Sequence, residues 1–384
     1  MLREKFTPIC FLSSLGAGGL SISFFMYLMF MIPHKGIPMT TFEFFYPALV
    51  KGDWLSFVSA LSAIAILVFA YFHFTLLVWN IKQFNLYKKT PAYTQMRSSN
   101  AEVTLMAIPL TLSMSINVCF VLGALFVPKL WSVVEYLFPL AIMGFGIAGY
   151  YALQLFIRYF SRLIIKGDFD FASNNNLSQM ISIFTFSMIA VGFAAPGAMS
   201  QYLAVNAIGI FAAIFFSMIA LLLLFIKLIF GFNTILKQGI SKEASPTLWI
   251  MIPILTLLGI TYIRISFGLD HHFDQKLVSS SLFTFTSAIL SLEVIFGIIG
   301  YKVMKEIGYF EEFVESENRS PVSFALICPG VALMVFGMFF IHFGLHANGV
   351  VEKNSLVYFI VMLPFVFIQY KTVRYFFKLK KKFF

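Results

Sequence analysis

The chain has 384 residues, of which 60% are hydrophobic and only 11% are charged, and its formal net charge is +10. Soluble domains carry charge on about a quarter of their residues, so this composition excludes an ordinary soluble protein. The basic excess does not indicate nucleic-acid binding, because the lysines and arginines are scattered in short loops and form no basic stripe. We therefore predict an integral membrane protein whose outer surface contacts membrane lipid and which has no nucleic-acid partner.

Ten apolar stretches are long enough to cross a bilayer, whose hydrocarbon core of roughly 30 Å needs about 20 helical residues. In chain order they are 14–33, 54–81, 103–127, 131–157, 177–199, 202–230, 247–267, 278–301, 321–345 and 355–377. Long unbroken apolar runs exclude a β-barrel, in which apolar and polar residues alternate. We predict an all-α fold with ten transmembrane helices and a single transmembrane domain over 1–384.

The distribution of lysine and arginine predicts the orientation, because these residues concentrate in cytoplasmic loops. With the N-terminus inside, 21 of the 27 basic residues fall on the cytoplasmic side, where those at the cytoplasmic ends of spans are counted, and five fall on the outer side, which leaves Arg264 alone within a span. So uneven a distribution requires an even number of spans. We therefore expect a multi-pass protein of a bacterial inner membrane with both termini in the cytoplasm.

The first, third, fifth, seventh and ninth stretches, here called the odd spans, recur about every 70 to 90 residues, which indicates five helical hairpins. Three of them share a pattern of proline, and the fifth departs from it because its proline, Pro196, lies at its far end. Ser245-Pro246 opens the seventh span and Pro253 follows, Ser320-Pro321 opens the ninth and Pro329 follows, and the third contains Pro109. We place the hairpin repeats at approximately 10–85, 100–160, 174–232, 246–305 and 320–378.

Proline inside a membrane helix bends it and frees carbonyl groups, which is tolerated only beside protein or a water-filled cavity. The odd spans also carry more hydroxyl side chains than the even ones. We predict that the odd spans line a pathway through residues Gly18, Ser21, Pro109, Ser113, Ser182, Thr185, Pro253 and Thr256. The alternative is that the serines and threonines hold helices together by hydrogen bonds.

Few ionisable residues fall at membrane depth, where each needs a partner or a wet cavity. Arg264 and His342 lie late in the seventh and ninth spans, and we predict that they form an outer vestibule that attracts anions. The alternative for Arg264 is to extend its side chain to the lipid headgroups. Glu293 lies deeper, and the sequence leaves open whether it pairs with His73 or faces a cavity.

The five hairpins and three segments, Leu15–Leu20, Val103–Pro109 and Phe324–Gly330, resemble the family of plant slow anion channels, bacterial tellurite-resistance channels and dicarboxylate transporters. The resemblance implies a quasi-fivefold barrel of ten helices around a central pore, assembled as a homotrimer. It also implies that a phenylalanine on the ninth helix, just before the bend, closes the pore.

At the place of that phenylalanine, immediately before Pro329, this chain has Cys328, and Phe324 lies one turn earlier. The resemblance therefore implies a gate formed by Cys328, Phe324 and Pro329. A thiol at this place can bind a metal, exchange disulfides or react with chalcogen oxyanions, which a phenylalanine cannot do. The ordinary alternative is a buried cysteine that acts as a small hydrophobic residue.

These observations favour a channel or transporter for small anions, with oxyanions of sulfur, selenium or tellurium ranked above dicarboxylates because only one arginine lies within a span. The three cysteines form no CxxC motif and no phosphate-binding GxxxxGK[ST] motif is present, so we predict no metal site, no cofactor and no enzymatic activity. The alternatives are a membrane-embedded thiol or redox enzyme that uses Cys328, and an assembly subunit without a pathway.

Overall fold

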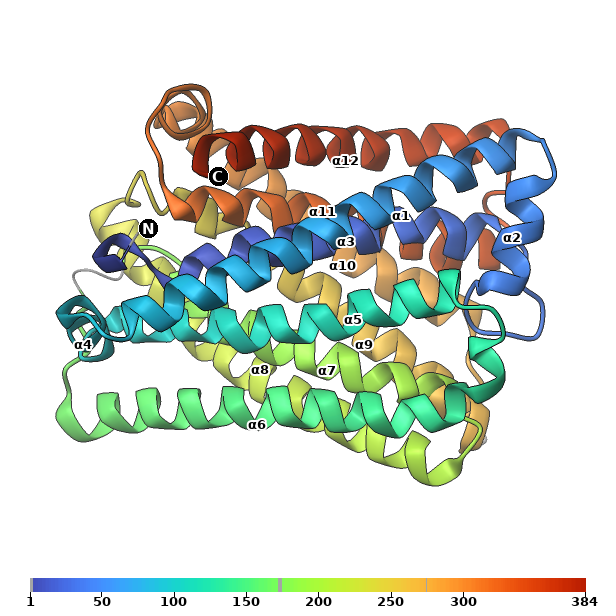
Figure 1. Cartoon of the computed structure of the whole chain (residues 1–384), viewed down its shortest axis with the longest axis horizontal. Helices are drawn as coiled ribbons and strands as arrows, with labels where there is room; N and C mark the ends of the chain where they lie inside the picture. Colours follow the sequence, from blue (N-terminus) through green and yellow to red (C-terminus); the bar gives the residue numbers. More distant parts are fainter. Residues whose placement is uncertain (1–2, 172–174, 274) are drawn as a thin grey trace.

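The computed structural model describes residues 3–171, 175–273 and 275–384, and this part of the chain is helical, with no strand (Figure 1). Ten segments are long and apolar enough to cross a membrane, which confirms the number predicted from the sequence. The helices are α1 (Phe11–Met31), α2 (Phe42–Val50), α3 (Trp54–Tyr87), α4 (Pro91–Arg97), α5 (Ala107–Phe126), α6 (Val134–Lys166), α7 (Ile181–Met199), α8 (Leu203–Gln238), α9 (Met251–His272), α10 (Ser279–Glu306), α11 (Ile327–Phe339) and α12 (Leu356–Phe383).

Some helix boundaries differ from the predicted ones because polar residues extend the helices beyond their apolar runs. α6 and α8 continue to Lys166 and Gln238, and each stops at a glycine with positive φ, Gly167 (63°) or Gly239 (74°). A residue without a Cβ adopts this conformation readily, so glycine ends the helix. The short helix α2 was not predicted, and residue 174, the expected start of the third hairpin, lies outside the described residues.

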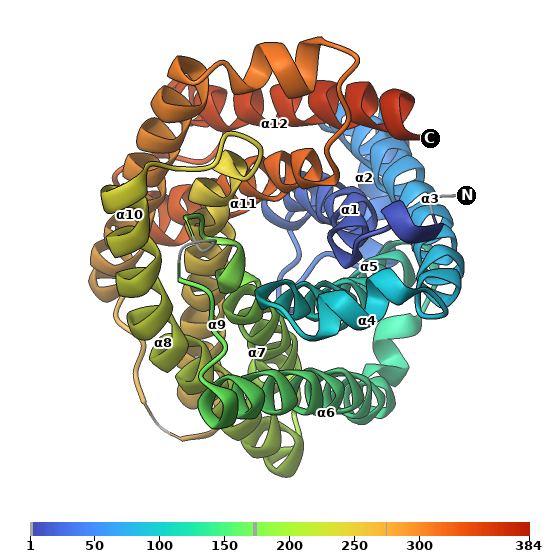
Figure 2. The same ribbon diagram turned by 90° about the vertical axis from the view of Figure 1, so that its left-hand side faces the viewer.

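The odd and even spans differ in burial. In the most apolar part of each span, 61% to 94% of the residues are buried in the odd spans and 17% to 44% in the even spans. The odd spans also contact one another in a closed circuit, α1 to α5, α5 to α7, α7 to α9, α9 to α11, and α11 back to α1. Figure 2 shows these five helices inside and α3, α6, α8, α10 and α12 around them.

Every odd span begins with a 3₁₀ segment at the end of the molecule where both chain termini lie, here called the terminal end. These segments are Pro8–Cys10, Asn100–Met106, Ser178–Met180, Ser245–Ile250 and Pro321–Leu326. Pro109, Pro253 and Pro329 are each the third residue of the α-helix that follows. Proline is tolerated in a first helical turn, so these prolines mark the change from 3₁₀ to α geometry and not a bend in mid-helix.

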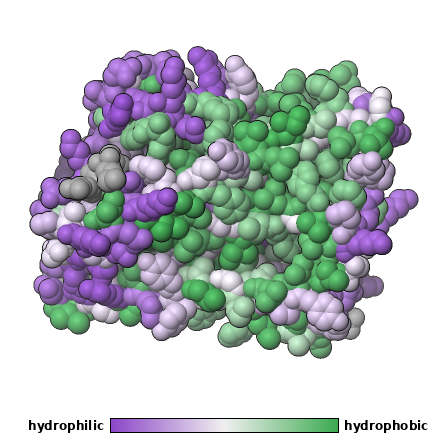
Figure 3. Space-filling view, in the orientation of Figure 1, coloured by the Kyte–Doolittle hydropathy of each residue, from purple (hydrophilic) through white to green (hydrophobic). Residues whose placement is uncertain are grey.

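The surface carries an apolar band between two polar ends (Figure 3), and the polar region is broader at the terminal end. Large apolar side chains of the even spans are exposed, such as Phe57, Tyr136 and Phe211. Such a band matches the hydrocarbon core of a bilayer, so the chain is a multi-pass membrane protein.

A buried carboxylate holds three elements together at the terminal end. Glu102 is 4% exposed, and its two oxygens lie 2.8 Å from Nε of Arg97 in α4 and 3.1 Å from Nε of Arg162 in α6. Arg162 also donates to the backbone carbonyls of Ser98 and Ser99, at 3.3 and 2.9 Å. This cluster fixes the start of the third span against α4 and α6.

We predict that Glu102→Ala lowers the free energy of unfolding by about 3 kcal/mol, because it leaves two partly buried arginines without their shared partner. Thermal unfolding in detergent measures the change. Glu306→Ala is the control, since Glu306 and its partner Lys302 are both exposed to solvent and such a pair contributes little to stability. Equal shifts for the two variants would show that the Glu102 cluster does not stabilise the fold.

Candidate functional site

Two cavities lie inside the circuit of odd spans. The smaller one, of about 220 Å³, lies toward the terminal end, and each of the five 3₁₀ segments contributes to its wall, through Ile9, Thr104, Ser178, Thr247 and Val322. The larger one, of about 860 Å³, lies toward the opposite, far end of the molecule and includes the loop residues His34 and Lys353. Both cavities are lined by side chains from several odd spans.

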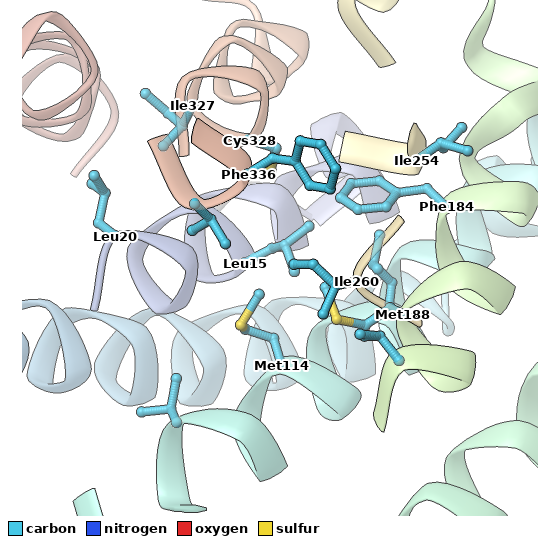
Figure 4. Packing of buried hydrophobic residues seen from close by; sticks show 14 of the residues in the cluster. Leu15, Leu20, Met114, Phe184, Met188, Ile254, Ile260, Ile327, Cys328 and Phe336 are labelled. Atoms are coloured by element: carbon cyan, nitrogen blue, oxygen red, sulfur yellow. The ribbon is translucent and has the colours of Figure 1, made fainter. Parts of the chain in front are cut away.

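The two cavities share three lining residues, Phe184 of α7, Pro253 of α9 and Cys328 of α11. Both side chains are buried, since Phe184 is 5% exposed and Cys328 is 8% exposed. In Figure 4 the Phe184 side chain points from α7 toward the side of the bundle that carries Cys328. The three residues therefore lie where the cavities meet, and they form a constriction.

Neither cavity has an aspartate or glutamate among its described lining residues, and the basic lining residues all belong to the far-end cavity. Arg264 of α9 lines the far-end cavity, and its Nη1 donates to the carbonyl oxygen of Val191 at 2.8 Å. No described carboxylate lies within ion-pair distance of its guanidinium group. The far-end cavity therefore carries an unneutralised positive charge on its wall.

Histidines and a lysine also line the far-end cavity, and two of the histidines favour the neutral form. His342 fits a neutral ring, since its Nδ1 lies 2.7 Å from the carbonyl oxygen of Met338 and its Nε2 lies 3.0 Å from the hydroxyl of Tyr358. Burial and then the nearby Lys353 lower the pKa of His34, and burial also lowers the pKa of Lys353. The positive charge at this end therefore comes from Arg264 and Lys353.

The structure places some of the predicted site residues on the cavity walls. Pro253, Thr256, Arg264 and His342 line the far-end cavity, Cys328 lines both cavities, and Pro329 lines the smaller one. The remaining predicted lining residues border neither cavity, namely Gly18, Ser21, Pro109, Ser113, Ser182 and Thr185. In the first span, Gly16 and Gly19 line the far-end cavity and Gly18 faces His73 and Met114.

Four predicted hydroxyl groups border neither cavity, and three of them bind backbone carbonyls, while the hydroxyl of Ser113 has no hydrogen-bond partner among the described residues. Ser21 donates to the carbonyl of Ile66 in α3, at 3.1 Å, and Thr185 donates to the carbonyl of Met106, at 2.9 Å. Ser182 accepts a hydrogen bond from the buried amine of Lys227, at 2.9 Å. These contacts favour the alternative that the hydroxyls join helices, and the walls of the two cavities are mostly apolar.

Phe324 is also remote from the constriction. Its side chain is 1% exposed, and its ring lies 5.2 Å from the ring of Phe383 and 6.1 Å from that of Phe384. It lines neither cavity, so it anchors the end of α12, while Cys328 lies where the cavities meet.

Sequence reasoning missed Phe184, the large side chain at the constriction. The chain has 49 phenylalanines, and no motif distinguishes this one. The nearest signal was its position between Ser182 and Thr185 in the most buried span, but residues two apart on a helix point in different directions.

Comparison of the chain with protein-family models, with curated proteins and with solved structures finds no match. The function is therefore inferred from the cavities and from the side chains that line them.

We predict that Phe184→Ala joins the two cavities and speeds the reaction of Cys328 with a small charged thiol reagent. The experiment uses a chain with Cys10 and Cys119 replaced by serine, so that Cys328 is the one reactive thiol. Phe186→Ala is the matched control, because Phe186 is also in α7 but packs against Phe156 and Phe216, outside the cavities. A rate equal to that of the control would contradict a constriction at Phe184.

Proposed function

We propose that this protein is a channel or transporter for small anions, and that its pathway runs through the two cavities. The observation that carries the proposal is the charge on the cavity walls, with Arg264 unneutralised and no acidic side chain among the described lining residues. A fixed positive charge in an apolar surrounding attracts anions and repels cations strongly, because the low dielectric constant there screens the charge much less than water does.

The direction of the odd spans adds to this potential. Their five N-terminal ends surround the smaller cavity, and each helix N-terminus carries roughly half a positive charge from the aligned peptide dipoles. Anions at the terminal end therefore meet five positive dipole ends, and anions at the far end meet Arg264. Both ends of the pathway favour the same sign of ion.

In this proposal the five hairpins form a barrel around a central pore, as in the anion-channel family that the sequence resembles. The gate lies at Cys328 and Pro253, and the ring of Phe184 on α7 fills the place that the resemblance gives to a phenylalanine on the ninth helix. The closed circuit of odd spans and the shared lining of the two cavities support this arrangement.

The proposed substrates are small inorganic anions, with oxyanions of sulfur, selenium or tellurium ranked above dicarboxylates. A dicarboxylate presents two separated charges, and the span regions of the far-end cavity wall offer one arginine. The proposed setting is a bacterial inner membrane with the terminal end in the cytoplasm, and the proposed assembly is a homotrimer by family resemblance. The broad polar region at the terminal end agrees with this orientation (Figure 3).

Flux of chloride and selenate into liposomes that contain the purified protein tests the proposal. The wild type should carry both anions, and Arg264→Gln should lower the flux by about tenfold, the effect of losing one desolvated charge interaction. Arg158→Gln is the matched control, because Arg158 is exposed on α6 and borders neither cavity. Absence of flux through the wild type, or equal flux through the two variants, would refute the proposal.

A further inference from the structure

Thr256 makes an unusual hydrogen bond. The threonines of the described spans donate to a backbone carbonyl three or four residues earlier, as Thr261 does to Leu257 at 2.7 Å and Thr286 does to Leu282 at 2.7 Å. Thr256 instead donates to Oε1 of Glu293 in α10, at 2.6 Å. Thr256 also lines the far-end cavity, one turn after Pro253 of the constriction. Its hydroxyl therefore connects the cavity wall to a carboxyl group behind it.

Glu293 has no exposed surface, and its Oε2 has no hydrogen-bond partner among the described residues. No described basic side chain lies within ion-pair distance of it. His73, the partner that the sequence left open, bonds Ser14 and Ser115 instead. A carboxylate without a cation or a second donor is costly at membrane depth. Binding of a proton removes that cost.

The titratable groups on the elements packed against α10 do not reach this carboxyl group by a hydrogen bond or an ion pair. They are Arg264, Asp270, His271, His272 and Tyr262 on α9, Lys227 and Lys237 on α8, Cys328 on α11, His342 and His346 after α11, and Tyr301, Lys302, Lys305 and Glu306 on α10 itself. Among the described residues, Thr256 is the one hydrogen-bond partner of Glu293.

We infer that Glu293 is a proton-binding site that switches the Thr256 hydroxyl between two directions and so controls the passage of anions. This inference rests on the proposed function. A hydroxyl has one hydrogen to donate and lone pairs that accept, while a carboxylate only accepts. With Glu293 ionised, the Thr256 hydrogen is held by Oε1, and the cavity faces the oxygen lone pairs, which repel an anion.

A proton from water in the cavity reverses this arrangement. The protonated carboxyl group donates its hydrogen to Thr256 Oγ1, and the Thr256 hydrogen turns into the cavity, where it binds an anion. Protonation also removes a negative charge from behind the cavity wall, which favours anions in the same direction. Release of the proton restores the first state, so proton binding and anion passage are linked.

The test measures chloride flux in liposomes with the same pH on both sides, because the charge of chloride does not change with pH. Wild-type flux should rise as the pH falls. Glu293→Gln, whose amide donates to Thr256 as the protonated acid would, should keep the high flux at every pH. Thr256→Val should lower the flux by roughly tenfold at low pH, the effect of one hydrogen bond to a charged group.

Two control variants distinguish a loss of flux caused by misfolding from a loss caused by the missing Thr256 hydroxyl. Thr256→Ser retains the hydroxyl and should restore the rise of flux at low pH that Thr256→Val loses. Thr261→Val removes a buried hydroxyl of the same helix that borders neither cavity and should leave the pH response intact. Wild-type flux that does not vary with pH, or a Glu293→Gln variant that responds to pH as the wild type does, would overturn the inference while anion transport stands. Absence of wild-type flux at every pH would overturn both.

Discussion

Every polar group at membrane depth needs a partner, and this requirement determines the interior of the protein. Backbone groups satisfy each other in helices, so the described chain has no strand. Most serine and threonine hydroxyls donate a hydrogen bond to a backbone carbonyl, as Ser21 and Thr185 do. Because these groups are occupied, the cavities have mostly apolar walls. The proposed chemistry of the interior depends on Arg264 and on the pair Thr256–Glu293, whose side chains lie on or behind the wall of the far-end cavity.

The same requirement explains the role of the three prolines. Pro109, Pro253 and Pro329 lie where a 3₁₀ segment becomes an α-helix. In the first turn of an α-helix the N–H groups have no carbonyl partner within that helix, so the N–H that proline lacks does not break a hydrogen bond in mid-helix. The 3₁₀ segments bring the five N-terminal ends together around the smaller cavity. A repeated local feature of the sequence thus produces a shared electrostatic property at one end of the bundle.

The sequence was sufficient for the number of spans and for the difference between odd and even helices, since both depend on apolar length and on the spacing of prolines and charges. It was insufficient for the direction of individual side chains. Ser182 and Phe184 are two residues apart, yet one bonds Lys227 and the other meets Cys328 at the constriction. Which face of α7 points inward depends on its contacts with α5, α8 and α9. The rotation of α7 about its own axis therefore cannot be predicted from its sequence alone. The partner of Glu293 was undetermined for the same reason.

In the proposed function, the pathway selects anions by the positive potential of its walls. The reversal potential of the current through the purified protein in a planar bilayer, under a gradient of potassium chloride, measures this selectivity directly. We predict a reversal potential close to the equilibrium potential of chloride, and for Arg264→Gln a shift toward zero. A reversal potential near the equilibrium potential of potassium would contradict the account.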